Sequence, residues 1–219
     1  MALEKTSVNF IPVAGKDFNV QYLLQGRNVI KENLSKGNYP FFFPGICCVW
    51  GGAIEQGETP LEGILRETNE ELHLNISKDQ VSTSALRIYN WEKDAVNLWG
   101  ELNEFFHGNL AGFFGPSLND KVPDCVLGKD RKSFKEIYGD FGTYFDWIKG
   151  REDHYLVVDF EQPFDATAYE GVGAFWTPHY ITRSIVTSTC DKFALLDDMM
   201  RRAKAGKLDI ESVKKNIAN

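Results

Sequence analysis

Cysteine is scarce in this chain, with four cysteines among 219 residues and no C-x-x-C pair. This spacing argues against the paired-cysteine zinc sites of small metal-binding modules. Cys47 and Cys48 are adjacent, and neighbouring side chains of a strand point to opposite faces, so we expect no disulfide between them. A reducing, cytoplasmic setting fits this cysteine usage best.

The sequence also lacks an excess of positive charge, an apolar leader and a membrane-spanning run. The net charge of −7 argues against a general affinity for nucleic acid or for an anionic membrane, although it leaves room for a local basic pocket. Glu4 and Lys5 stand where a signal peptide would carry its apolar core. Residues 37–54 are uncharged, but Pro40, Pro44 and several glycines make them unsuited to a spanning helix.

Hydrophobic residues make up 43% and charged residues 25% of the chain, which is the composition of a folded globular protein. We expect a single domain over residues 1–219 that needs neither a disulfide nor a metal to fold. Short apolar runs bounded by turn residues predict strands, and apolar residues at helical spacing predict helices. The predicted strands are residues 8–13, 18–24, 39–50 (a pair), 84–91 and 154–160, and the predicted helices are residues 59–74, 190–205 and 209–218.

Residues 94–150 separate the last two predicted strands and are rich in Phe, Trp and Tyr. The apolar residues of 95–106 recur at helical spacing, which predicts an amphipathic helix. So many aromatics argue for a folded helical insertion over a disordered linker. Two interpretations stay open: the aromatics form a small core of their own, or some of them, such as Trp99, Phe105 and Phe145, roof a ligand site.

The predicted helix at residues 59–74 has well-marked ends and faces. Thr59 suits the N-cap, Pro60 the first helical position, and Glu62 completes a capping box. One face carries the apolar residues that must pack against the sheet, and Thr68 lies on that face.

A second face of this helix is acidic. Glu67, Glu70 and Glu71 fall within about 100° of arc, and carboxylates at this spacing repel one another. Hard divalent cations prefer clustered oxygen ligands of this kind. Arg66, four residues before Glu70, is placed to orient a carboxylate. The alternative interpretation is a solvated acidic surface with no ligand.

The segment from Gly52 to Leu74 resembles the Nudix box of the MutT-like hydrolases. That box has a glycine, five residues, a glutamate, seven residues, and then Arg-Glu-apolar-x-Glu-Glu-x-Gly-apolar. The residues that match at the required spacing are Gly52, Glu58, Arg66, Glu67, Glu70, Glu71 and Leu74. Two positions depart from it. Thr68 replaces an aliphatic residue, and His73 replaces the closing glycine, which often adopts a backbone conformation that histidine disfavours.

The resemblance implies an α/β fold, namely a Nudix-type α/β/α sandwich around a mixed β-sheet, with an aromatic-rich helical insertion. Residues 1–93 and 151–219 would form the sandwich, and residues 94–150 would form the insertion within it. Residues 170–176 resemble the loop before the last strand of that fold.

The resemblance further implies a Mg²⁺ site, in which Mn²⁺ can substitute. Its implied ligands are the carboxylates of Glu67, Glu70, Glu71 and Glu170 and the Gly52 carbonyl. The implied catalytic residues are Arg66, Glu67, Glu70 and Glu170. Arg66 would act with Glu58 by holding the helix against its loop, whereas Glu67 and Glu170 are both candidates for the base.

The implied function is a divalent-metal-dependent pyrophosphohydrolase that cleaves a nucleoside diphosphate linked to another moiety. Nucleotide sugars, ADP-ribose and dinucleoside polyphosphates are the substrate types considered. The proline that marks many ADP-ribose hydrolases is absent, since Tyr89 and Asn90 stand in its place. The alternatives are a Nudix-fold nucleotide-binding or regulatory module without hydrolysis, and an RNA 5′-end pyrophosphohydrolase, which the net charge disfavours. A small-molecule nucleotide derivative is therefore the expected partner, and no binding to a membrane is expected. A homodimer is compatible with this function, because many members of the family are dimers.

Overall fold

The structure of the protein is a computed structural model, and it describes part of the chain. The residues that it describes are 6–27, 30–31, 39–40, 47–90, 97, 100–101, 104–105, 152–169, 171–186, 189–211 and 213. Most of the predicted insertion at 94–150, including Trp99 and Phe145, lies outside the described residues.

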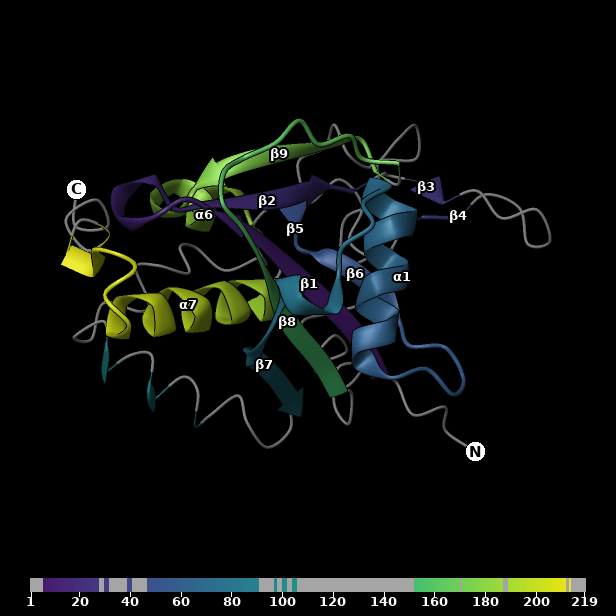
Figure 1. Cartoon of the computed structure of the whole chain (residues 1–219), viewed down its shortest axis with the longest axis horizontal. Helices are drawn as coiled ribbons and strands as arrows, with labels where there is room; N and C mark the ends of the chain where they lie inside the picture. Colours follow the sequence, from purple (N-terminus) through teal and green to yellow (C-terminus); the bar gives the residue numbers. More distant parts are fainter. Residues whose placement is uncertain are drawn as a thin grey trace.

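A seven-stranded mixed sheet forms the centre of the protein (Figure 1). Its strands are β1 (Thr6–Ala14), β2 (Gln21–Gly26), β5 (Cys47–Cys48), β6 (Trp50–Ala53), β7 (Val81–Asn90), β8 (Glu152–Phe160) and β9 (Gly173–Pro178). β1 and β8 are parallel, and the remaining pairs are antiparallel. β9 and β7 lie toward opposite edges of the sheet. The short strands β3 (Ile30–Lys31) and β4 (Tyr39–Pro40) form a separate ladder.

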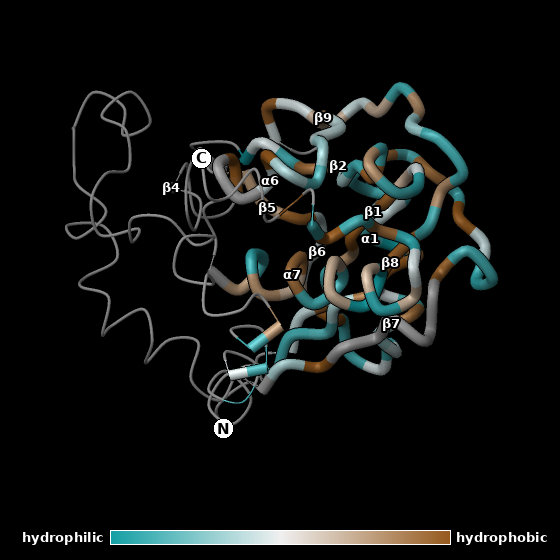
Figure 2. Tube along the Cα trace, turned by 90° about the vertical axis from the view of Figure 1, so that its left-hand side faces the viewer, coloured by the Kyte–Doolittle hydropathy of each residue, from teal (hydrophilic) through white to brown (hydrophobic). Residues whose placement is uncertain are grey.

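Among the described helices, α1 and α7 pack on opposite faces of this sheet, because the central strands are apolar on both faces. In β1, Val8 and Phe10 pack in a core cluster with Ile64 of α1 (Pro60–Leu72), whereas Ile11 and Val13 pack in a second cluster with residues of α7 (Thr189–Lys204). This alternation is the period of two expected of a strand that is buried on both sides. Hydrophobic segments accordingly concentrate in the strands (Figure 2). The α/β sandwich with a mixed sheet was predicted from the sequence and is confirmed.

The register of β1 brings the box glycines next to α1. Residues Ser7 to Phe10 of β1 pair with β6, whereas only its last residues, Val13 and Ala14, pair with β2. The prediction that Gly51 and Gly52 follow the strand was wrong, since both lie within β6. Their lack of a side chain lets a strand run directly beneath the helix, which the periodicity of larger residues could not indicate.

Other boundaries also differ from the prediction. Phe18 was assigned to a strand but lies in a 3-10 turn, η1 (Asp17–Asn19), where 59% of its surface is exposed. A second 3-10 turn, η2 (Lys78–Gln80), precedes β7. Helix α6 (His179–Ile185), which follows β9, was not predicted. None of the described helices is both long and apolar enough to cross a membrane.

Phe105 is one of the few described residues of the insertion, and it bears on the two interpretations of its aromatics. Its side chain packs against the core cluster beneath α7, and Lys204 Nζ lies 5.8 Å from the centre of its ring. The described contacts of Phe105 thus join it to the main core of the domain.

Candidate active site on helix α1

The start of α1 forms the capping box that the sequence predicted. Glu62 N donates to Thr59 Oγ1 (3.3 Å), and Thr59 N donates to Glu62 Oε2 (2.8 Å). Pro60 occupies the first turn, where its missing N–H costs nothing. These contacts fix where the helix begins and therefore which residues face the sheet.

The end of α1 explains how histidine can replace the closing glycine of the box. His73 adopts the left-handed conformation (φ 52°, ψ 31°), which histidine visits more readily than most residues other than glycine. Its N–H donates to Asn69 O (2.9 Å), and Leu74 N donates to Thr68 O (3.3 Å). The His73 ring also stacks on Tyr169, with ring centres 3.3 Å apart. The departure from the box thus keeps the backbone conformation that glycine would provide.

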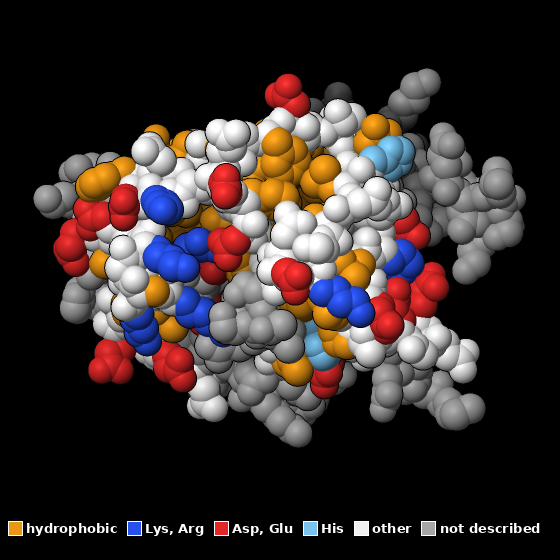
Figure 3. Space-filling view, viewed as in Figure 1, with side chains coloured by type: hydrophobic (Ala, Val, Ile, Leu, Met, Phe, Trp, Pro, Cys, Tyr) orange, Lys and Arg blue, Asp and Glu red, His pale blue; other side chains and the backbone are white. Residues whose placement is uncertain are grey.

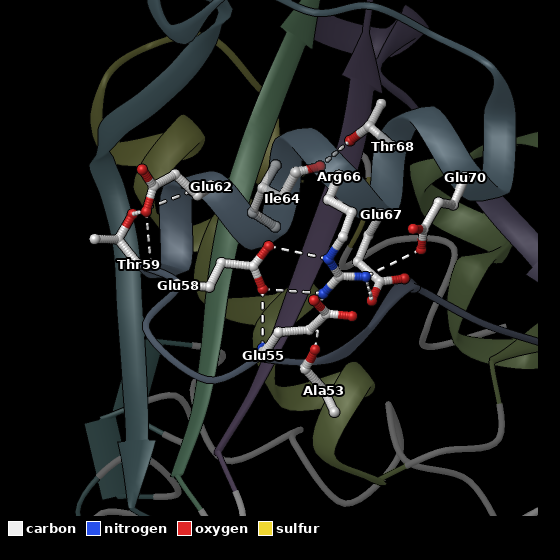
Figure 4. A network of polar contacts seen from close by, with 10 residues as sticks. All are labelled: Ala53, Glu55, Glu58, Thr59, Glu62, Ile64, Arg66, Glu67, Thr68 and Glu70. Atoms are coloured by element: carbon white, nitrogen blue, oxygen red, sulfur yellow. Dashed lines mark hydrogen bonds and ion pairs between the residues drawn. The ribbon is translucent and has the colours of Figure 1, made fainter.

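Arg66 forms the centre of a polar network between the helix and the loop before it (Figure 4). Its guanidinium pairs with Glu58 through two contacts, Nε to Oε1 (2.9 Å) and Nη2 to Oε2 (3.1 Å). Nη1 donates to Glu67 Oε1 (2.7 Å) and to Glu70 Oε2 (3.0 Å), and Nη2 donates to the Ala53 carbonyl (2.9 Å). One arginine therefore joins two glutamates of the acidic face to the loop and to β6.

The charges of this network stabilise one another. Hydrogen bonding to Arg66 lowers the pKa of Glu58 below its ordinary value, so this carboxylate stays ionised. The same hydrogen bond raises the pKa of Arg66. Arg66 also offsets the repulsion expected between Glu67 and Glu70, because it contacts both.

Two glutamates of the acidic face point at the glycine backbone of β6. Glu67 lies so close to Gly52 that a methyl group at position 52 would collide with its carboxylate. Glu71 Oε2 accepts a hydrogen bond from Gly51 N (3.0 Å). Gly51 has a positive φ of 140°, and a side chain there would strike the backbone of Val8. Only glycine therefore allows strand and carboxylates to approach this closely.

The three glutamates predicted to share one face differ in exposure. Glu67 and Glu71 are buried, whereas the side chain of Glu70 is 54% exposed and turns toward Arg66. Glu170 lies outside the described residues. Its neighbours in the chain are close to the site, since Tyr169 N donates to Glu71 O (2.9 Å) and Val172 N donates to Gly26 O (2.7 Å).

The donor set suits a hard divalent cation in its chemistry. All of the candidate donors around Gly52 are oxygens, and the glycine backbone makes a cradle beside Glu67 that any side chain would fill. In the described part of the chain, no three His, Cys, Asp or Glu side chains converge closely enough to hold a metal ion together. Arg66 instead holds Glu67 and Glu70, so a cation at this site would draw these carboxylates away from their present partners.

Several residues of the site carried no sequence signal. Gln25 Nε2 donates to Glu71 Oε1 (3.3 Å) from strand β2, far from the box in sequence. The Ala53 carbonyl is a main-chain acceptor that any residue could supply. Tyr89, which stands near the place of the absent proline, is buried in the core, where its hydroxyl donates to Asp197 (2.9 Å).

No protein-family model matches the chain, and no curated protein sequence matches it. Among solved structures, the chain is similar to a C. elegans Ap4A hydrolase in a binary complex, with 13% identity, 91% of this chain and 98% of that chain covered, and a TM-score of 0.48. It is similar to the E. coli dihydroneopterin triphosphate pyrophosphohydrolase, with 9% identity, 87% of this chain and 92% of that chain covered, and a TM-score of 0.46. It is also similar to the NUDIX domain of Shewanella oneidensis NrtR complexed with ADP ribose, with 11% identity, 92% of this chain and 90% of that chain covered, and a TM-score of 0.47. Nudix proteins are thus among the solved structures that align with the chain, and the proposals below depend on its own residues.

Proposed function

We propose that this protein is a Nudix-type hydrolase that cleaves the pyrophosphate of a nucleoside diphosphate linked to another moiety. The observation that carries the proposal is the pair of buried carboxylates, Glu67 and Glu71, which lie against the glycine backbone of β6. Burying two carboxylates side by side on a helix is costly unless charge or hydrogen bonding compensates for it. A surface helix with a merely solvated acidic face would leave them exposed.

In this proposal Glu67, Glu70 and Glu71 hold Mg²⁺ or Mn²⁺, together with the Gly52 carbonyl and Glu170. The bound cation supplies positive charge that brings the polyanionic substrate and its leaving group against carboxylates.

Arg66 and Glu58 have a positioning role in the proposed site. Their two-contact ion pair holds the loop before α1 against the helix, and Arg66 also contacts the Ala53 carbonyl of β6. The base that accepts a proton from the attacking water is Glu67 or Glu170. Replacing each by glutamine would distinguish them, because only the variant that lacks the base would change the pH dependence of turnover.

The deciding experiment is a substrate panel with the purified chain in Mg²⁺. It measures release of mononucleotide from nucleotide sugars, ADP-ribose, dinucleoside polyphosphates and nucleoside triphosphates, with and without chelator. Glu62→Gln is the matched control on the same helix, since glutamine at this position keeps the capping box. No turnover of any substrate, or full turnover in chelator, would refute the proposal.

A second candidate is a nucleotide-binding module without hydrolysis. The observation that favours it is the engagement of Glu67 and Glu70 by Arg66, with no converging metal cluster among the described residues. Isothermal titration with the same panel separates the two candidates: tight binding without product supports the module. Including a 5′-triphosphorylated RNA tests the RNA-end alternative, and light scattering of the pure protein tests the expected homodimer.

A further inference from the structure

Glu71 is buried and is held by hydrogen bonds from two strands. Only 4% of its surface is exposed, and each of its carboxylate oxygens accepts an N–H from a different strand. Gly51 N of β6 donates to Oε2 (3.0 Å), and Gln25 Nε2 of β2 donates to Oε1 (3.3 Å). By contrast, Glu70 contacts the flexible side chain of Arg66 at the surface.

Gln25 is itself held in one orientation. It is 4% exposed and lies directly opposite Cys48 in the β2–β5 ladder. Cys48 Sγ donates to Gln25 Oε1 at 3.7 Å. Burial raises the pKa of the Cys48 thiol, so the thiol keeps its proton and remains a donor.

A thiol donor on one side and a carboxylate acceptor on the other determine which way the amide faces. With Oε1 toward Cys48, the amide presents Nε2 to Glu71, and the reverse orientation would set oxygen against carboxylate. The chain Cys48–Gln25–Glu71 therefore runs from β5 through β2 to α1, and each of its two links joins a donor to an acceptor.

We propose that Gln25 is a positioning residue that orients the Glu71 carboxylate for metal binding, and that Cys48 sets the orientation of the Gln25 amide. The proposal rests on the proposed function, because it assumes that Glu71 is a metal ligand. Residues that orient metal ligands affect metal affinity without touching the metal. Hydrogen bonds from Gln25 and Gly51 occupy two of the acceptor positions of Glu71 and fix the direction of the others.

The test measures Mn²⁺ affinity directly by electron paramagnetic resonance titration of the metal-free protein. Gln25→Met keeps the length of the side chain and removes the donor, and we expect the dissociation constant for Mn²⁺ to rise by about 10-fold to 100-fold. Gln21→Met is the matched control, since Gln21 lies on the same strand and the same side, four residues earlier. Its dissociation constant should stay within about twofold of wild type. Gln25→Asn, which keeps the amide but draws it back by one methylene, serves if Gln25→Met does not fold, with the same direction expected.

Cys48 provides an independent check of the orientation. Cys48→Ser keeps an O–H donor and should retain more Mn²⁺ affinity than Cys48→Ala, which leaves Gln25 Oε1 without its donor. A merely structural role would lower the melting temperature of the metal-free variants and leave the dissociation constant unchanged.

The outcomes separate this proposal from the proposed function. If wild type binds Mn²⁺ and Gln25→Met and Gln25→Asn bind it equally well, the positioning role of Gln25 is overturned while the metal site stands. Equal affinity of Cys48→Ser and Cys48→Ala overturns the role of Cys48 alone. If wild type itself binds no Mn²⁺ at millimolar concentration, the metal site and the proposed function are overturned together with this inference.

Discussion

Helices α1 and α7 pack on opposite faces of the same sheet and both carry buried carboxylates, yet these carboxylates meet different partners. On the α7 face, three tyrosines from three strands each donate a hydroxyl to one aspartate of the helix. These pairs are Tyr22 with Asp198, Tyr89 with Asp197, and Tyr155 with Asp191, each at 2.9 Å. All three aspartates are buried. Their acceptors are used within the fold, so this acidic row anchors the helix to the sheet.

On the α1 face, the strand beneath the carboxylates offers glycine backbone instead of tyrosine hydroxyls. Glu67 lies against Gly52, and Glu71 accepts from Gly51 N. In Figure 3, acidic and basic side chains lie together over α1, and a second group of Lys and Arg lies toward the end of α7. Glycine leaves space beside a carboxylate, whereas the ring of a tyrosine fills that space and its hydroxyl donates to the carboxylate. The residues opposite an acidic row, more than the row itself, therefore distinguish a candidate metal site from a structural network.

The largest expected effect tests this distinction through Glu67. We expect Glu67→Gln to slow hydrolysis of the best substrate by about 10²–10³-fold, since losing one ligand raises the barrier by about 3–4 kcal/mol. It should also shrink the rise in melting temperature caused by Mg²⁺. Turnover and thermal unfolding with and without Mg²⁺ measure both effects.

Asp197→Asn is the counterpart on α7. It removes one charge from a carboxylate that accepts from Tyr89 and pairs with Arg201. It should lower the free energy of unfolding by about 1–3 kcal/mol and leave the Mg²⁺ response intact. A Mg²⁺ response that fell equally in both variants would break the comparison between the two faces.

The second prediction concerns pH and Asp191 on α7. Burial raises the pKa of Asp191 from 3.8 to about 6, partly offset by the hydrogen bonds from Tyr155 and Val49. Because the folded-state pKa is the higher one, the stability from this group is fully present below about pH 4 and is lost as pH rises to about 6. A shift of about two units corresponds to about 3 kcal/mol.

Asp191→Asn should therefore remove that part of the pH dependence. We expect the free energy of unfolding of wild type to fall by about 3 kcal/mol relative to Asp191→Asn between about pH 4 and pH 7. Urea denaturation across this range measures the difference. Asp165→Asn, at an exposed position, is the control for loss of one charge. Parallel curves for wild type and Asp191→Asn would contradict the prediction.

The box helix could be predicted from the sequence because its signals are local. The capping residues Thr59 and Glu62 and the buried position of Thr68 follow from neighbours within one turn, and the structure confirms each. Thr68 also satisfies its hydroxyl locally, since Oγ1 donates to Ile64 O (2.6 Å).

What the sequence did not predict depends on contacts between distant segments. Gln25 meets Glu71 across 46 residues, and Tyr22 meets Asp198 across 176, so no local pattern marks either pair. The predicted strand ended at residue 50, before Gly51 and Gly52, because glycine is typical of turns, whereas here close approach of the helix requires it within a strand. The roles of Glu170 and of most of residues 94–150 stay predictions.

The third prediction tests the geometry of the Arg66 network. Arg66→Lys keeps the charge but cannot make two parallel contacts to Glu58 while also reaching Glu67, Glu70 and Ala53. We expect turnover to fall by about tenfold, which is about 1.4 kcal/mol at the transition state. Steady-state kinetics with the best substrate measures it. A tenfold loss that Glu58→Gln reproduces would point to the Glu58 pair, whereas unchanged rates in both would mean that the network does not position the site.

The smallest expected effect concerns His73 at the end of α1, where backbone strain and ring stacking oppose each other. His73→Ala keeps the left-handed conformation and loses the stack on Tyr169, so we expect a loss of about 1 kcal/mol in the free energy of unfolding. His73→Gly loses the same stack but relieves the backbone by about 1 kcal/mol, and should match wild type closely. Urea denaturation of both variants and of Tyr169→Ala measures the balance. If His73→Ala is as stable as wild type, the stack contributes nothing to the free energy of unfolding. If His73→Gly is as unstable as His73→Ala, the positive φ of residue 73 carries no strain.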